Sequence, residues 1–151
     1  MKHYHQNNLL KFLFLGETPA RFNKMHQMVD QELLPLDIQL ESNLSMAITN
    51  LHQSTRHYLP QVIVLNVDAP QNSILRFIEQ FELLLAPLYS QTLFFLSGDQ
   101  SSQFFSTLSQ RFPFIVGFIE NPFERISIEK IVANLLSKIE EKLLPSNHEM
   151  A

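Results

Sequence analysis

The sequence predicts one α/β domain, a three-layer sandwich in which helices cover both faces of a parallel five-stranded sheet. Five short apolar runs alternate with five helical runs along the 151 residues. The central runs are apolar at every position, which is typical of strands buried on both faces. Because crossovers between parallel strands are right-handed, strict alternation of strand and helix places helices on both sides of one sheet.

The first two strands are expected at 12–16 and 34–41. "FLFLG" is apolar throughout, whereas apolar and polar residues alternate in "LPLDIQLE", which indicates an edge strand with one wet face. Between them, Thr18 is a suitable N-cap and Pro19 a suitable first helical residue. The helix that follows should bury a stripe spaced by three and four residues, Phe22, Met25, Val29 and Leu33.

The remaining strands are expected at 62–65, 92–96 and 114–120, and a helix at 44–58. The inward-facing helical residues should be Ala47, Ile48 and Leu51, then Ile74, Phe77, Ile78, Phe81 and Leu85, then Phe104, Phe105 and Leu108, and finally Ile128, Ile131, Val132, Leu135, Leu136 and Ile139. With the second strand at an edge, the strand order is expected to be 2-1-3-4-5, as in flavodoxin-like folds.

Composition limits the partners and the compartment. The net charge is -4, and the eleven Lys and Arg residues are scattered, which argues against nucleic acid as a partner. The chain has no cysteine, so it forms no disulfide and no thiolate metal site. The apolar stretch near the N-terminus is too short to span a bilayer. We expect a cytoplasmic protein with one domain at 9–144, flexible tails at 1–8 and 145–151, and no membrane partner.

Polar residues gather where the predicted strands end. They are Gly16 and Glu17 after the first strand, Asn66 and Asp68 after the third, Ser97 after the fourth and Asn121 after the fifth. The carboxyl ends of parallel strands share one edge of a sheet, and open α/β sheets bind their ligands there. We therefore expect these six residues to line one pocket.

The order of these strand ends, together with "GFIENPF" (117–123), resembles the CheY-like receiver domain of two-component response regulators. The resemblance covers about residues 10–144. It implies a small phosphoryl-transfer site, in which carboxylates hold Mg²⁺ and an Asp after the third strand takes the phosphoryl group. A hydroxyl after the fourth strand and a Lys after the fifth would bind the phosphoryl oxygens.

The chain departs from that pattern at most of the site. By the resemblance, Asn66 stands at the phosphoacceptor position, Gly16 at the first acidic position and Asn121 at the Lys position. Ser97 keeps the hydroxyl, and Phe118 stands at the position of the family's aromatic switch residue, although packing alone would also account for it. An amide is no nucleophile for a phosphoryl group, so we expect Asn66 to be inactive and the domain to be a pseudo-receiver.

The loss of carboxylates affects metal binding as well. Only Glu17, with Asp68 if it turns inward, is left to hold a cation that needs near-octahedral oxygen ligands. Mg²⁺ binding is therefore expected to be weak or lost, with no other cofactor and no catalytic residue. The amides of Asn66 and Asn121 could instead hydrogen-bond to one another across the pocket.

The sequence therefore predicts a non-enzymatic, stand-alone signalling module of a two-component phosphorelay that acts by protein–protein interaction. The resemblance implies a sensor histidine kinase, a phosphotransfer protein or another receiver as partner. It also implies a docking and homodimer face on the fourth helix, the fifth strand and the fifth helix. Phe104 and Phe105 are the candidate contact residues on the fourth helix, because one ring of such a pair must face away from the core. Two alternatives stay open: a receiver with residual metal or phosphate sensing, and a flavodoxin-like domain that binds a small ligand or takes phosphate at Ser97 or Asp68.

Overall fold

The computed structural model describes residues 9–53, 59–68 and 71–143. The predicted tails, 1–8 and 145–151, and the last five residues of the helix predicted at 44–58 lie outside the described residues. Within the described ranges, no helix is both long and apolar enough to cross a membrane.

The sheet has the predicted strand order. Its strands are β1 (Leu10–Leu15), β2 (Leu36–Glu41), β3 (Val62–Asn66), β4 (Leu93–Ser97) and β5 (Ile115–Ile119). All neighbours are parallel, in the order β2-β1-β3-β4-β5. The described residues therefore form a flavodoxin-like α/β fold. All five carboxyl ends lie at one edge of the sheet, the edge at which the predicted pocket residues stand.

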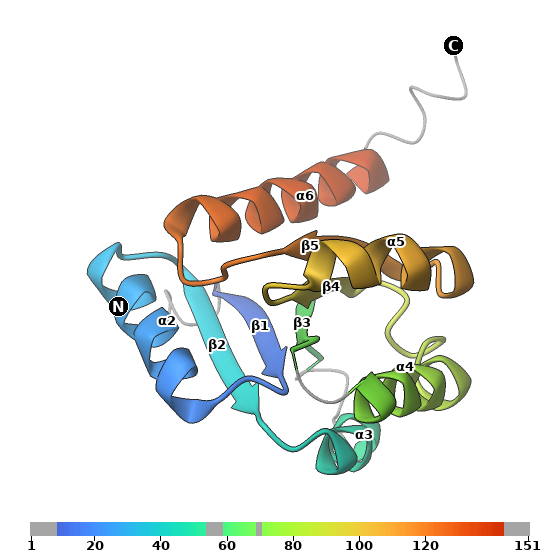
Figure 1. Cartoon of the computed structure of the whole chain (residues 1–151). Coiled ribbons are helices and arrows are strands. Elements are labelled where there is room, and N and C mark those ends of the chain that lie inside the picture. Colours follow the sequence, from blue (N-terminus) through green and yellow to red (C-terminus); the bar gives the residue numbers. More distant parts are fainter. Residues whose placement is uncertain (1–8, 54–58, 69–70, 144–151) are drawn as a thin grey trace.

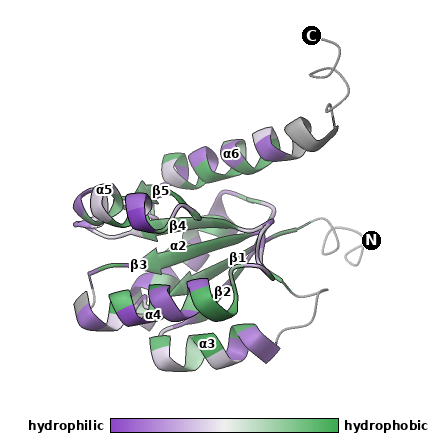
Figure 2. Ribbon diagram, turned by 90° about the vertical axis from the view of Figure 1, so that its right-hand side faces the viewer, coloured by the Kyte–Doolittle hydropathy of each residue, from purple (hydrophilic) through white to green (hydrophobic). Residues whose placement is uncertain are grey.

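Helices cover both faces of this sheet, as predicted (Figure 1). They are α2 (Pro19–Gln31), α3 (Leu44–Gln53), α4 (Gln71–Leu84), α5 (Ser101–Arg111) and α6 (Arg125–Leu143). The strands are mainly hydrophobic, and the helices around them carry hydrophilic and hydrophobic residues in turn (Figure 2). Thr18 is the N-cap of α2, as expected, because its hydroxyl accepts a hydrogen bond from the backbone N–H of Arg21.

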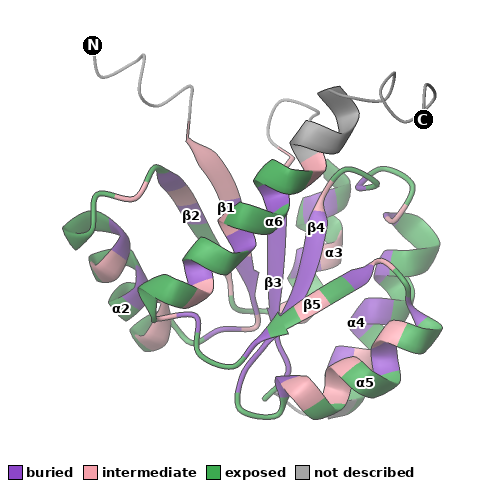
Figure 3. Cartoon of the chain, turned by 90° about the horizontal axis from the view of Figure 1, so that it is seen from above, coloured by how far each residue is buried: buried purple, intermediate pink, exposed green. Residues whose placement is uncertain are grey.

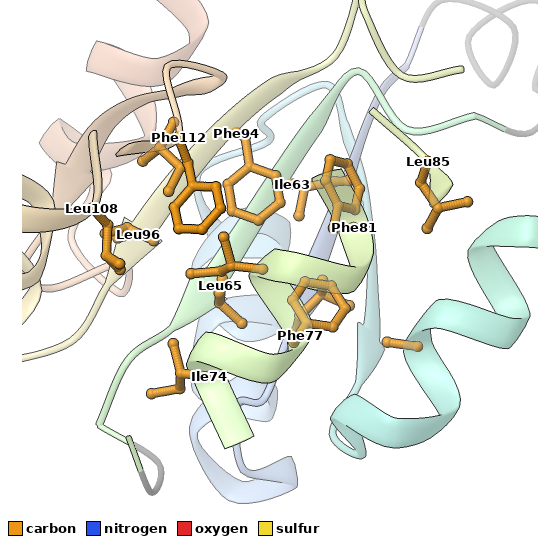
Figure 4. Close-up of a cluster of buried hydrophobic side chains, with 14 of the residues drawn as sticks. Ile63, Leu65, Ile74, Phe77, Phe81, Leu85, Phe94, Leu96, Leu108 and Phe112 are labelled. Carbon is orange, nitrogen blue, oxygen red and sulfur yellow. The ribbon is translucent and has the colours of Figure 1, made fainter. Parts of the chain in front are cut away.

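The core on one face is made by α3, α4 and α5. Phe77 and Phe81 of α4 point toward Ile63 and Leu65 of β3 (Figure 4). The ring of Phe81 lies 5.1 Å from that of Phe94, a distance at which aromatic pairs attract one another. The predicted stripe of α4 is confirmed, because Ile74, Phe77, Ile78, Phe81 and Leu85 are all buried.

The core on the other face is made by α2 and α6. Met25 and Val29 of α2 and Ile128, Ile131 and Leu135 of α6 pack against side chains of β1 to β5. Alternate residues of each central strand serve the two cores, as the pleat of a strand requires. Phe12 and Phe14, for example, face α2 and α6, whereas Leu15 faces the opposite core.

Two predictions of burial are wrong. Leu33 is 87% exposed, because α2 ends at Gln31 and Leu33 adopts a left-handed conformation (φ 53°) just beyond it. The N–H of Leu34 then bonds to the carbonyl of Val29, which closes the helix end. Leu136 is also exposed, because the buried stripe of α6 runs through Leu135.

Candidate functional site

At the carboxyl edge of the sheet, where the six residues were expected to line one pocket, Glu17 and Asn66 instead form a buried polar centre. Both side chains are almost fully buried, with 2% and 5% of their surface exposed. The Asn66 amide donates a hydrogen bond of 3.0 Å from Nδ2 to Glu17 Oε2. Its Oδ1 accepts a bond of 2.7 Å from the backbone N–H of Asp68. The amide at the end of β3 is thus held on both sides.

Arg21 brings a positive charge to this centre. It stands one turn after Glu17, and its Nε lies 3.1 Å from Glu17 Oε1. The N–H is not aligned for a hydrogen bond, so the contact is an ion pair. The guanidinium also stacks on Phe123, 4.9 Å from the ring centroid. Arg21 therefore links the end of β1 to the loop that follows β5.

Asp68 turns away from this centre toward the start of α5. Its carboxylate accepts hydrogen bonds from the backbone N–H groups of Asp99 (3.1 Å) and Gln100 (3.4 Å). The N-terminal end of a helix favours negative charge, so this carboxylate is well placed there. The contact joins the loop after β3 to the loop after β4.

Gly98 makes this contact possible. Its φ is +113°, and a Cβ at this position would lie only 2.6 Å from Asp68 Oδ2. Any side chain would push the Asp68 carboxylate away. The neighbouring residue, Ser97, is buried, and its backbone carbonyl accepts a bond from Val67. Gly16, after β1, also has a positive φ of +74°, which favours glycine at the position where the receiver pattern has an acidic residue.

Asn121 is not part of the buried centre. Its side chain is exposed, its Oδ1 accepts a bond from the backbone N–H of Phe123, and its Nδ2 donates to Glu124. The hydrogen bond predicted between Asn66 and Asn121 is not formed. Both polar ends of each amide are bonded elsewhere, Asn66 to Glu17 and Asp68, and Asn121 within its own turn.

Three aromatic residues predicted to have a role are partly exposed on α5 and β5. Phe118 on β5 is 42% exposed, and its ring lies 5.5 Å from that of Phe105 on α5. Phe104 and Phe105 are each half-buried against the core on the α4 side. Phe104 also lines a groove between α4 and α5. The helix therefore uses both rings for packing and leaves part of each at the surface.

The donors present do not fit a Mg²⁺ site. Glu17 is paired with Arg21 and Asn66, and the Asp68 carboxylate is bonded to the start of α5. Among the described residues, no group of three or more His, Asp or Glu side chains could hold a metal ion. Mg²⁺ needs several oxygen ligands in near-octahedral geometry, and a cation here would also have to displace the guanidinium.

Comparison with known proteins finds similarity in structure only. No family model matches the sequence. No curated protein matches it either. A two-component response regulator from Cytophaga hutchinsonii superposes with a TM-score of 0.69 at 12% identity, covering 85% of this chain and 98% of that one. The chemotaxis protein CheY4 of Vibrio cholerae gives 0.63 at 13% identity, covering 84% and 98%.

A third solved structure carries a different description. A protein from Rhodopirellula baltica described as an adenylate cyclase superposes with a TM-score of 0.61 at 12% identity, covering 94% of this chain and 96% of that one. At such identities, the three superpositions establish the fold of the chain. They agree with the strand order predicted from the sequence.

The sequence interpretation missed Arg21 as a site residue. Its signal was the spacing of four residues from Glu17, which places the two side chains on neighbouring turns where the chain enters α2. Gly98 was also not singled out from the sequence. Its role depends on a contact with Asp68, thirty residues earlier in the chain, and no local pattern shows such a contact.

Proposed function

We propose that this chain is a receiver-like signalling module that acts through protein–protein contacts and is not phosphorylated at the end of β3. The fold is that of solved response regulator receivers. The observation that carries the proposal is the state of Asn66, an amide held between Glu17 and the Asp68 backbone. The module would work in the cytoplasm, within a two-component phosphorelay.

In this proposal, contacts within the chain fix the conformation that phosphate and metal would otherwise control. The family that the sequence resembles shifts between two conformations when a phosphoryl group binds. Here, Arg21 supplies the positive charge at the centre, and the Asp68 carboxylate joins the loops after β3 and β4. Because the chain's own side chains hold these loops together, the domain keeps one conformation. A partner protein binds that conformation directly.

The proposed docking face consists of α5, β5 and α6. β5 forms one margin of the sheet (Figure 3). Val116 and Phe118 on this strand are 50% and 42% exposed, and Ile126 at the start of α6 is 58% exposed. Large apolar side chains gathered at a surface are typical of protein interfaces. A histidine kinase, a phosphotransfer protein, another receiver or a second copy of the chain is the proposed partner.

An assay of phosphoryl transfer tests the proposal. The protein is incubated with acetyl phosphate and Mg²⁺, and its intact mass is measured at neutral pH. We expect no phosphoryl adduct, because neither Asn66 nor the buried, ion-paired Glu17 offers a free carboxylate at the end of a strand. A stoichiometric adduct on any residue of the pocket, Ser97 and Asp68 included, would overturn the proposal.

A further inference from the structure

A second cleft opens beside the buried centre, on the α3 and α4 side of the sheet. Its volume is about 780 Å³, within the range of small-molecule sites. Its walls come from three segments, each following a different strand: Gly16 after β1, residues 42–45 after β2, and α4 after β3. Figure 1 shows α3 and α4 next to one another at this end of the sheet.

The position of the cleft is one where ligands commonly bind in open α/β sheets. In the order β2-β1-β3-β4-β5, the chain runs from β1 to β2 at one edge of the sheet, and from β3 to β4 in the direction of the other edge. The crevice outside the carboxyl ends of two such strands is the usual binding place in doubly wound folds. The cleft borders this crevice on the α3 and α4 side, because its walls contain Gly16 at the end of β1 and residues of α4.

The described lining residues are mostly polar, and Arg76 is the one among them that carries a formal charge. Side chains that can donate hydrogen bonds dominate the lining: Ser42, Asn43, Ser45, Asn72, Ser73, Arg76 and Gln80. One of these donors, the Ser45 hydroxyl, is already bonded to Asn43 Oδ1. None of the lining residues that the structure describes carries a carboxylate. Leu44 and Phe77 complete the wall, and Phe77 is buried, so it offers little surface for stacking.

Arg76 differs from the other arginines that the structure describes. Arg21 pairs with Glu17, Arg111 with Glu79, and Arg125 with both Glu32 and Glu129. Of these four arginines in the described ranges, only Arg76 has no carboxylate within ion-pair distance. It is exposed at the wall of the cleft, where its planar fork of donors is available to an anion.

We propose that this cleft binds a small metabolite carrying a phosphate group, with Arg76 on the phosphate. A guanidinium binds phosphate oxygens in a bidentate manner, and serine hydroxyls and amide groups satisfy the remaining oxygens. The other polar residues would hold the hydroxyl-bearing part of the ligand. This site is separate from Glu17 and Asn66, and it does not depend on the docking proposal.

Binding of mononucleotides tests the inference. AMP, inorganic phosphate and adenosine are titrated separately into the intact chain, and backbone amide shifts are followed by NMR. We expect AMP to cause saturable shifts in α4 and residues 42–45, inorganic phosphate to bind the same residues more weakly, and adenosine to cause no saturable shift.

Two arginine variants identify the contact. Arg76→Gln should weaken AMP binding by roughly tenfold or more, the effect of removing a charge-assisted hydrogen bond. Arg111→Gln serves as the matched control, because Arg111 is paired with Glu79 and lies outside the cleft, so AMP binding should be unchanged. The inference is wrong if no phosphate-bearing probe gives saturable shifts in the cleft, or if Arg76→Gln binds AMP as well as the native chain.

Discussion

Asn66 shows how one change of side-chain chemistry alters what a strand end can do. A carboxylate at this position could attack a phosphoryl group, whereas the amide donates a hydrogen bond to Glu17 and accepts one from Asp68. Asn66 also helps to stabilise the buried charge of Glu17. One carboxylate oxygen of Glu17 accepts the hydrogen bond from the Asn66 amide, and the other lies beside Arg21. A buried charge is tolerated only when it is paired in this way.

Replacing Arg21 by Gln should therefore destabilise the fold. The change leaves the buried Glu17 carboxylate without its cation and removes the stacking on Phe123. We expect the free energy of unfolding in urea to fall by about 1–3 kcal/mol, less than for a fully buried pair because Arg21 is one-third exposed. Arg111→Gln, which breaks an exposed pair, should change it by no more than about 0.5 kcal/mol. Equal losses in the two variants would show that Glu17 does not need Arg21.

Replacing Gly98 by Ala should destabilise the protein through a specific neighbour. The backbone conformation itself costs about 1–3 kcal/mol for a residue with a Cβ, and the new methyl would also meet the Asp68 carboxylate. In an Asp68→Ala background only the backbone cost remains, so the same substitution should cost less. Urea unfolding of the four proteins in this double-mutant cycle measures the difference. A coupling of zero would mean that Asp68 does not lie over Gly98.

Residue types at the strand ends could be predicted from the sequence, but their partners could not. Glu17, Asn66 and Asp68 stand at the carboxyl edge, as expected from where the apolar runs stop. The direction of the Asp68 side chain depends on the start of α5, and the partner of Asn66 depends on how β1 pairs with β3. Such contacts are set by the packing of distant elements, so a hydrogen bond guessed from amide chemistry, Asn66 to Asn121, is not formed.

Among the elements, the strands and their order were the most predictable. A continuous apolar run such as 62–65 has few alternatives to a central strand, and the alternation in β2 marks an edge. Element ends were less predictable, because they depend on single backbone conformations. The end of α2 depends on the left-handed conformation of Leu33, a residue that apolar spacing alone places on the buried stripe.

Among the elements of the proposed docking face, β5 allows the most direct test of partner binding. Substituting Glu for Phe118 places a charge on its exposed face and should leave the fold intact, because the ring is 42% exposed. If the face forms a homodimer, we expect the affinity of self-association to fall at least about tenfold in this variant. If it binds another protein, we expect the same loss of affinity for purified kinases or receivers of the same organism. Sedimentation velocity measures the first and calorimetry the second.

Leu83→Glu is the matched control for this substitution. Leu83 is an apolar residue of α4 that is 79% exposed and lies outside the proposed docking face, so the same charge there should leave binding unchanged. If Phe118→Glu is folded and binds like the native chain, the face of α5, β5 and α6 is not the docking surface.

At the scale of the whole molecule, the loops at the carboxyl edge are tied by internal contacts. Arg21 joins the start of α2 to the loop after β5, and Asp68 joins the loop after β3 to the start of α5. A receiver-like domain with such ties should not respond to the ligands that switch a phosphorylated receiver. The fold and its docking face would then be retained without the switch.

Titration with Mg²⁺ and then beryllofluoride, followed through backbone amide shifts by NMR, tests this most directly. Because Glu17 and Asp68 are bonded within the chain, we expect no saturable shift at Glu17, Asn66 or Ser97. The double variant Arg21→Gln with Asn66→Asp, which frees one carboxylate and adds another, should gain Mg²⁺-dependent shifts and shows that the method detects binding. Saturable shifts in the native chain, spreading from Glu17 and Ser97 to Phe118, would contradict the claim that the domain does not respond to a phosphoryl group.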